Sequence, residues 1–301
     1  MDYKDIEVKE NFVLVKGVAN FDPVHIFECG QCFRWNKVSD NDFIGVAYGR
    51  VIEVVKEGDD LIIFNSTEED FYNIWCDYFD LRRNYSEIKA ELSKDPLLKK
   101  AVDFGYGIRI LNQEPFEIVN SFIISANNRI PMIKRAIENI SKRWGEPLEY
   151  KGVTYYAFPS PERLAAVEDG ELESCGLGFR AKYVKDTVSK IHGSLEGQES
   201  LEKYNIYDIA KMDDDHCHKA LQEFKGIGPK VADCIMLFSM NKITAFPVDV
   251  WVKRAMVHFY TAPDLSLKKI RDFARDKFGE KAGFAQQYLF YYARENNIKI
   301  E

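Results

Sequence analysis

The sequence predicts an α+β fold in which an N-terminal antiparallel β-sheet domain packs on a larger α-helical body. Two observations lead to this fold class. Short segments within residues 5–66 alternate apolar and polar side chains and are separated by turn signals, as expected of neighbouring antiparallel strands. From about residue 67 the apolar residues recur at helical spacing instead, and after residue 113 nearly every segment shows this pattern.

The predicted sheet is built from short strands joined by short turns. The Gly58-Asp59 pair is a turn signal for a hairpin. A short helix is expected over residues 22–29, directly before Gly30. The segments that predict strands are 12–19, 43–48, 51–55 and 59–64.

The helical part begins with two clear start signals, at Thr67 and at Asn84. The expected interruptions of the later helices are loops at 144–147, 158–161 and 194–197. We place the domain boundary so that residues 1–112 form the β-sheet domain and residues 113–301 form the helical domain.

Length and charge restrict the classes of function. The chain has 301 residues, enough for two domains with sizeable cores. Its net charge of −7 and pI of about 5.5 argue against an indiscriminate polyanion binder, but they do not exclude a local basic face. Such a face is offered by residues 179–190, which carry Arg180, Lys182, Lys185 and Lys190 against Asp186 alone.

The cysteine usage favours a cytoplasmic protein, and the acidic pI and the lack of a targeting sequence favour a microbial one. Among six cysteines only Cys29 and Cys32 are close in sequence, without the second pair that a four-cysteine zinc site requires. A zinc site or a redox role for this pair is therefore poorly supported, no cofactor is expected, and a reducing compartment fits best. The first residues are acidic and lack the apolar core of a secretory signal. No run of eighteen apolar residues exists, so we expect no membrane span. We also expect a monomer.

The strongest functional signal lies in residues 221–254. Gly226 and Gly228 form a turn in which the backbone can approach an external group closely. Pro229 suits the first turn of the helix that follows. The free N–H groups at this helix start are suited to bind an anion, and a DNA phosphate is the natural candidate.

Lys230 and Asp249 are the candidate catalytic residues. A lysine desolvated in a cleft has a lowered pKa and can attack an electrophilic sugar carbon as a free amine. A nearby carboxylate stabilises the positive charge that develops on the sugar. From the residues alone, Lys230 also fits a solvent or phosphate contact, and Asp249 also fits a plain N-cap of the helix after it.

Five stretches occur in order along the chain: 30–35, 124–128, 176–183, 226–233 with Pro247-Val-Asp249, and 282–290. Together they resemble the 8-oxoguanine DNA glycosylase/AP lyase family of the helix-hairpin-helix (HhH-GPD) DNA glycosylase superfamily. The resemblance covers almost the whole chain and places the helix-hairpin-helix at about 217–240. It implies that Lys230 is a Schiff-base nucleophile and that Asp249 is its electrostatic partner.

The resemblance also implies a pocket for a base that has been flipped out of the duplex. The base would stack between Cys234 and Phe290, and its Watson–Crick edge would bind Gln286. The Gly30 carbonyl would accept a hydrogen bond from N7–H, which 8-oxoguanine carries and guanine lacks. On the residues alone these positions also fit core packing and, at Gly30, a turn. The implied base pocket comprises Gly30, Cys234, Phe238, Gln286 and Phe290.

The DNA contacts implied by the resemblance lie in three segments. Asn127 would fill the space left by the flipped nucleotide, Phe179 would wedge into the base stack, and Arg180 would contact the orphaned base. An exposed Phe-Arg loop tip suits these roles, whereas the Asn pair also fits a helix C-cap. The implied set is Asn127, Asn128, Met132, Phe179, Arg180, Lys182, Gly226 and Gly228, and backbone carbonyls of Gln222, Phe224 and Ile227 could hold a monovalent cation.

The chain departs from the family pattern at two positions. Met132 stands where members from higher organisms carry an arginine that helps to read cytosine opposite the lesion, so we predict a weaker cytosine preference. Trp251 stands where many members have a histidine, which changes the polar contacts expected around Asp249. No iron–sulfur cysteine cluster follows the hairpin, which disfavours the endonuclease III branch.

The predicted function is therefore excision of 8-oxoguanine from duplex DNA by a bifunctional glycosylase/AP lyase. Two alternatives stay open at this point. One is a monofunctional glycosylase for alkylated bases that uses Asp249 and water, although such chemistry needs no lysine. The other is a non-catalytic helix-hairpin-helix protein that only binds DNA.

Overall fold

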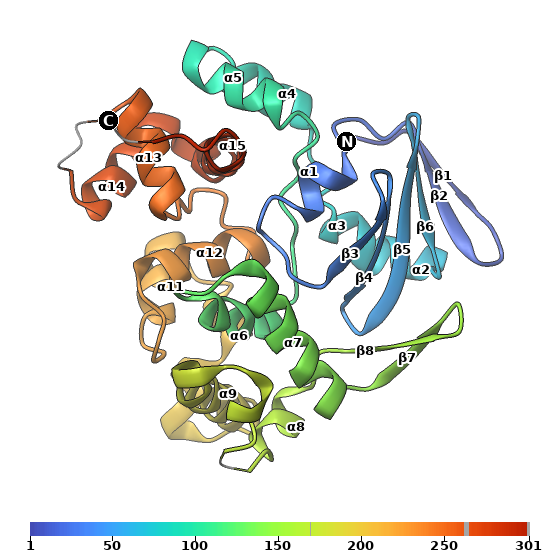
Figure 1. The fold of residues 1–301 in the computed structure, drawn as a ribbon, viewed down its shortest axis with the longest axis vertical. Coiled ribbons are helices and arrows are strands. Elements are labelled where there is room, and N and C mark those ends of the chain that lie inside the picture. Colours follow the sequence, from blue (N-terminus) through green and yellow to red (C-terminus); the bar gives the residue numbers. More distant parts are fainter. Residues whose placement is uncertain (169, 262–264, 300–301) are drawn as a thin grey trace.

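A computed structural model describes residues 1–168, 170–261 and 265–299 (Figure 1). The N-terminal part is a six-stranded sheet with the order β1-β2-β6-β5-β4-β3, and every neighbouring pair is antiparallel. The predicted fold class is confirmed. The strands are β1 (Asp5–Val8), β2 (Phe12–Lys16), β3 (Trp35–Ser39), β4 (Asp42–Ala47), β5 (Arg50–Glu57) and β6 (Asp60–Phe64).

The register of the sheet follows from the alternation of its side chains. Val13 of β2 lies opposite Ile63 of β6, which lies opposite Val54 of β5, which lies opposite Phe43 of β4. All four side chains are buried, because residues opposite each other in a ladder point to the same face. Helix α1 (Pro23–Phe27) lies against the sheet, and its Phe27 stacks on Trp35 of β3 with ring centroids 4.0 Å apart.

The helices of the N-terminal part begin at the residues that the sequence indicates. Thr67 and Asn84 cap the helices that follow them, which confirms both predicted starts. The short helix expected before Gly30 is also present. These elements are α1 (Pro23–Phe27), α2 (Glu68–Asp70), a π-helical turn over Phe71–Trp75, α3 (Cys76–Tyr78), α4 (Tyr85–Leu92) and α5 (Pro96–Phe104).

The remainder is predominantly helical, and its hydrophobic core, which is separate from the core under the sheet, also includes side chains of α4 and α5. The central helix α12 (Pro229–Ser239) is buried along most of its length. It packs against α6 (Pro115–Ser125) and α11 (Asp214–Leu221). The other helices of this part are α7 (Ile130–Trp144), α8 (Pro161–Ala165), α9 (Ala181–Leu195), α10 (Ile206–Ile209), α13 (Val250–Phe259), α14 (Leu267–Phe278) and α15 (Ala282–Glu295). The boundary at 112/113 stays a prediction. Within the described residues no helix is long and apolar enough to cross a membrane.

One element of the helical part was not predicted. Residues expected to form only a loop and helix build a two-stranded hairpin of β7 (Pro147–Tyr150) and β8 (Val153–Tyr156). The turn residues Lys151 and Gly152 both have positive φ, as two-residue hairpin turns require. Lys151 and Tyr150 bind the Glu53 carboxylate of β5, each at 2.5 Å, so the hairpin connects the helical part to the sheet.

Candidate active site

The predicted helix-hairpin-helix is present as α11, a turn over residues 222–228, and α12. Gly226 has a φ of +88°, and a Cβ atom built there would lie 2.9 Å from the Tyr183 side chain. Gly228 differs, because its φ of −96° is accessible to any residue and no atom of the described residues lies within 4 Å of a Cβ placed there. The space in front of Gly228 is thus open to an external group, and the amide groups at the start of α12 are free to bind an anion.

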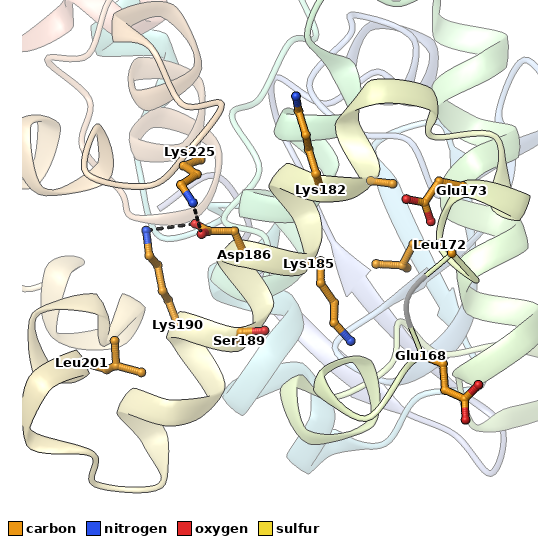
Figure 2. A pocket seen from close by; sticks show the side chains of 12 residues that line it. Glu168, Leu172, Glu173, Lys182, Lys185, Asp186, Ser189, Lys190, Leu201 and Lys225 are labelled. Atoms are coloured by element: carbon orange, nitrogen blue, oxygen red, sulfur yellow. Dashed lines mark hydrogen bonds and ion pairs between the residues drawn. The ribbon is translucent and has the colours of Figure 1, made fainter.

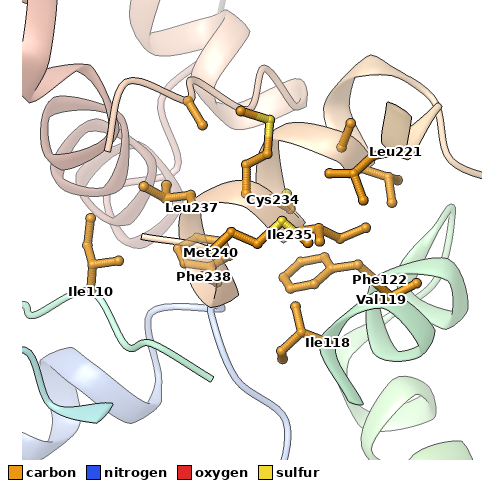
Figure 3. Close-up of a cluster of buried hydrophobic side chains, with 14 of the residues drawn as sticks. Ile110, Ile118, Val119, Phe122, Leu221, Cys234, Ile235, Leu237, Phe238 and Met240 are labelled. Atoms are coloured by element: carbon orange, nitrogen blue, oxygen red, sulfur yellow. The ribbon is translucent and has the colours of Figure 1, made fainter. Parts of the chain in front are cut away.

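Lys230 and Cys234 lie one turn apart on α12, as their i and i+4 spacing predicts. The Lys230 ammonium lies 5.8 Å from the centroid of the Phe122 ring. The Phe122 ring in turn stacks on Phe238, with centroids 5.7 Å apart and an interplanar angle of 20°. Figure 3 shows Cys234, Phe238 and Phe122 in one apolar cluster. The lysine therefore emerges from an apolar wall.

Asp249 is the N-cap of α13, as predicted. Its carboxylate accepts hydrogen bonds from the amides of Trp251 at 2.9 Å and Val252 at 2.8 Å. These bonds fix the carboxylate at the mouth of the same cavity that Lys230 lines. Trp251 contributes only its backbone amide to these bonds, which any residue at this position could supply.

A small cavity of about 60 Å³ brings the predicted catalytic and base-pocket residues together. They come from the loop at residue 30, from α12, from the segment before α13 and from α15, so folding joins positions that are far apart in sequence. The cavity also contains residues that the sequence reasoning did not select. Its lining is Gly30, Phe122, Lys230, Cys234, Phe238, Pro247, Asp249, Gln286, Gln287 and Phe290.

The three additional lining residues differ in how clearly the sequence indicates a place in the site. Pro247 belongs to the Pro247-Val-Asp249 motif and could have been selected from it. Gln287 follows Gln286 directly, but the base contact expected of Gln286 gives no reason to expect a role for the next residue. Phe122 lies in an apolar helix among other large side chains, so nothing in the sequence distinguishes it from core.

The charges in the cavity act on one another. The pKa of the Lys230 amine is raised by the adjacent Cys234 sulfur and by Asp249, although burial lowers it. Burial raises the pKa of the Cys234 thiol to about 11, so this group is protonated at neutral pH. Burial also raises the pKa of the Asp249 carboxyl. Because a protonated thiol carries no charge, the Asp249 carboxylate is the group that favours the Lys230 ammonium at neutral pH, and burial opposes it.

The segments expected to contact DNA are only partly exposed. Phe179 is 56% exposed, as expected of a side chain that wedges between bases. Arg180 is only 8% exposed and donates hydrogen bonds to the carbonyls of Ala126 and Asn127, each at 2.7 Å. The expectation of an exposed Phe-Arg tip is therefore wrong for Arg180, because the guanidinium satisfies the carbonyls at the end of α6.

The remaining positions around α6 and α7 are arranged as follows. Asn127 has a φ of +50°, which asparagine tolerates better than most residues. The Asn128 side chain donates to the Ile124 carbonyl at 3.1 Å and accepts from the Arg129 amide at 2.9 Å, which is the capping role considered for it. Met132 is 45% exposed on the first turn of α7.

Most basic side chains of residues 179–190 bind groups of the protein itself, and Figure 2 shows Lys190 and Lys225 on the Asp186 carboxylate. The Lys185 ammonium donates to the carbonyls of Val167 and Ala165. Lys190 forms an ion pair with Asp186 at 2.9 Å, and Lys225 of the hairpin binds the same carboxylate at 2.7 Å. Lys182 is exposed and makes no ion pair within the described residues, so it is the member of this run that is free to meet a phosphate.

The carbonyls considered for a monovalent cation lie in the hairpin turn. The Phe224 carbonyl accepts a hydrogen bond from the Ile227 amide at 3.2 Å. Across the described residues, no hydrogen bond to the carbonyls of Gln222 or Ile227 is present. A cation site at these three carbonyls stays a prediction.

Comparison with known proteins identifies two matching families and several relatives. Residues 13–119 match "8-oxoguanine DNA glycosylase, N-terminal domain", and residues 120–280 match "HhH-GPD superfamily base excision DNA repair protein". A crystal structure of Clostridium acetobutylicum 8-oxoguanine glycosylase/lyase, in complex with DNA containing cytosine opposite 8-oxoguanine, is 58% identical. It superposes with a TM-score of 0.95 over 99% of this chain and 100% of that one.

Two curated relatives agree with these matches. A probable N-glycosylase/DNA lyase of Methanothermobacter thermautotrophicus is 36% identical over 73% of this chain and 74% of its own length. The N-glycosylase/DNA lyase OGG1 of Arabidopsis thaliana is 29% identical over 88% of this chain and 75% of its own length. The similarity extends through both the sheet and the helical body.

Proposed function

The chain belongs to the HhH-GPD superfamily of base excision DNA repair proteins, and from this premise we propose that it excises 8-oxoguanine from duplex DNA and cleaves the resulting abasic site. One observation carries the proposal. A single cavity contains an amine, a carboxylate and the apolar and amide groups that a flipped purine requires. The relatives are named as N-glycosylases with lyase activity, which agrees with an amine nucleophile.

Lys230 would supply the nucleophile. Its amine is protonated in the DNA-free protein because its pKa is raised, so it must lose a proton before it can attack. The Asp249 carboxylate, whose own pKa is raised by burial, is a suitable acceptor for that proton or stabiliser of the positive sugar. The Lys230 nitrogen then bonds to C1′, the bond from C1′ to the base breaks, and the base leaves with its electron pair and takes up a proton.

The same lysine explains strand cleavage. Opening of the sugar ring converts the C1′–nitrogen bond into an imine, which makes a proton on C2′ acidic. Removal of that proton expels the phosphate at the 3′ carbon, and water later hydrolyses the imine and regenerates Lys230. Each step uses only the amine, the carboxylate and water, so no cofactor is needed for this chemistry.

The base pocket would determine which purine enters. Cys234 and Phe290 would stack on the two faces of the base, with Phe238 supporting the apolar wall. Gln286 would bind the Watson–Crick edge; its Oε1 atom is buried and has no partner among the described residues, which leaves it available to a ligand. The Gly30 carbonyl would accept the N7–H of the lesion and disfavour guanine, whose N7 is an acceptor.

The DNA duplex would lie across the hairpin and the Phe179 loop. The start of α12 behind Gly228 would grip one phosphate, and Lys182 would meet another. Phe179 would fill the stack beside the flipped nucleotide, with Asn127 in the gap. We also infer that the protein acts as a monomer, which light scattering with and without duplex DNA would test.

Borohydride trapping tests the chemistry directly. The wild-type protein is expected to form a covalent adduct with a duplex that contains 8-oxoguanine, and Lys230→Gln to form none. Lys268→Gln, which changes an exposed lysine of α14 in an i,i+4 pair, is the matched control and should trap normally. Base release without an adduct would instead indicate a monofunctional enzyme, and binding without any product would indicate a DNA-binding protein.

A further inference from the structure

The loop that contains Gly30 is held by two buried glutamines, one on each side of the glycine. Gln287 of α15 donates from Nε2 to the Cys29 carbonyl at 2.9 Å. Gln113, which precedes α6, donates from Nε2 to the Gln31 carbonyl at 2.8 Å. Both glutamine side chains are buried, so neither bond competes with water.

A third donor holds the same loop one residue earlier. Arg294 of α15 donates from its guanidinium to the Glu28 carbonyl at 2.6 Å. The same guanidinium lies 5.3 Å from the centroid of the Phe290 ring. The helix that carries Phe290 and Gln286 into the cavity therefore also fixes the position of the loop opposite them.

The Gly30 carbonyl differs from the two neighbouring carbonyls in its hydrogen bonding. The carbonyls before and after it accept the hydrogen bonds described above, whereas Gly30 receives none from any described residue. Gly30 has a φ of +85° and lines the cavity, and a Cβ atom added there would lie 3.1 Å from the Phe290 ring. A backbone carbonyl at such a position normally has a partner, so this one is left for a ligand.

The Gln31 side chain anchors the loop from its own end. Its Oε1 atom accepts from the Leu111 amide at 2.9 Å. Its Nε2 atom donates to the carbonyls of Arg109 at 2.7 Å and Ile26 at 2.9 Å. Because this side chain is fully buried, the loop cannot shift without breaking bonds that water would not replace.

We infer that Gln287 and Gln113 are positioning residues for lesion recognition: they fix the backbone on both sides of Gly30 so that its carbonyl meets N7–H of the flipped base. The inference rests on the proposed function, in which that carbonyl recognises 8-oxoguanine. Neither glutamine needs to touch the base in this role. Their hydrogen bonds convert a flexible glycine into a fixed acceptor, which is what discrimination by one hydrogen bond requires.

The test compares two reactions of the same protein. Gln287→Met keeps the length of the side chain and removes the donor to Cys29. Single-turnover excision of 8-oxoguanine is expected to fall by about 10- to 100-fold, the range associated with misplacement of a recognition group by a fraction of an ångström to 1 Å. Cleavage of a preformed abasic site is expected to stay unchanged, because that reaction uses Lys230 without a base in the pocket.

A second variant and a control keep the result interpretable. Gln113→Met removes the donor on the other side of Gly30 and should have the same selective effect. Asn139→Leu removes a donor to a carbonyl elsewhere, that of Cys175 at 3.2 Å, and should change neither reaction. Equal loss of both reactions in the two glutamine variants, or loss of neither, would overturn the inference. A wild-type protein that cleaves abasic sites and does not release 8-oxoguanine would instead overturn the proposed substrate, and with it this role.

Discussion

The buried Asp233 carboxylate of α12 accepts two hydrogen bonds from the guanidinium of Arg271 in α14, at 2.6 Å and 2.8 Å. Asp233 immediately precedes Cys234 and follows Lys230 by three residues. A bidentate pair fixes orientation as well as distance. The pair therefore holds in place the helix that carries both the proposed nucleophile and one wall of the cavity.

Replacing Arg271 by methionine is expected to lower the free energy of unfolding by about 3 kcal/mol or more, because it leaves a buried carboxylate without its charged partner. His218 lies 3.6 Å from the same carboxylate, but burial lowers the pKa of its imidazole and so opposes its charging beside Asp233. Urea denaturation measures the loss. The control is Arg163→Met, which breaks an exposed pair with Glu146 and should cost less than about 1 kcal/mol. Similar losses in both variants would contradict the argument.

The two hairpin glycines should respond differently to alanine. Gly226→Ala places a side chain at a φ of +88° and against Tyr183, so we expect it to destabilise the fold by at least about 1–2 kcal/mol. Gly228→Ala meets open space at an ordinary φ, so the fold should be unaffected while the added methyl obstructs the approach of a phosphate. Thermal unfolding and binding to a duplex by anisotropy separate the two effects. The idea fails if Gly228→Ala binds DNA as tightly as the wild type.

Asp249→Asn is expected to stabilise the folded protein at neutral pH while it impairs excision. Burial raises the pKa of the Asp249 carboxyl, so ionising this group is costlier in the folded than in the unfolded chain. Asparagine remains a good N-cap. Between a pH of about 3.9, the ordinary pKa of this carboxyl, and its raised pKa in the folded protein, the folded wild type binds more protons than the unfolded chain. The free energy of unfolding of the wild type therefore falls as pH rises through this window.

The advantage of Asp249→Asn should therefore be absent near pH 3, grow through that window and stay constant above it. Thermal unfolding of both proteins across this pH range measures the difference. A variant less stable than the wild type at pH 7 would show that the carboxylate stabilises the fold. Excision measured on the same samples would then show whether any stability gained comes with loss of activity.

The parts of the fold that could be predicted are those with local signals. Thr67 and Asn84 mark helix starts because their side chains bond to the next amides in the chain. Asp249 could be placed as an N-cap for the same reason. The β7–β8 hairpin also has a local signal, namely Lys151-Gly152 and the aromatic and β-branched residues that follow. This signal is short and lies between segments with helical spacing, so the pattern of the region as a whole predicts helix and loop.

The parts of the site that escaped prediction depend on contacts distant in sequence. Arg180 lies in a stretch that predicts an exposed loop. Its guanidinium instead binds carbonyls at the C-terminal end of α6, more than fifty residues earlier in the chain, and this contact cannot be read from the local sequence. The pKa of Lys230 depends on Cys234 and Asp249 as well as on burial, which acts in the opposite direction, so burial alone does not predict it. Gln287 is linked to the Gly30 loop by its hydrogen bond to the Cys29 carbonyl, which lies near the other end of the chain, so the sequence around Gln287 does not indicate this role.

Met132→Arg is expected to strengthen the preference for cytosine opposite the lesion. The methionine is 45% exposed, so an arginine fits without disturbing the core, and its guanidinium can donate to a base edge, which a thioether cannot. A well-placed arginine contact contributes about 1–3 kcal/mol of discrimination, which is roughly a 5- to 160-fold change in the ratio of excision opposite cytosine to excision opposite adenine. Single-turnover rates on duplexes with each opposite base measure this ratio.

The control variant is Ile130→Arg, which adds the same charge to the same helix. Since Ile130 is not the recognition position, this change should raise the excision rates opposite all four bases alike. If both variants change only the overall rates, residue 132 does not read the opposite base; a steep cytosine preference in the wild type would contradict the reading of Met132 itself.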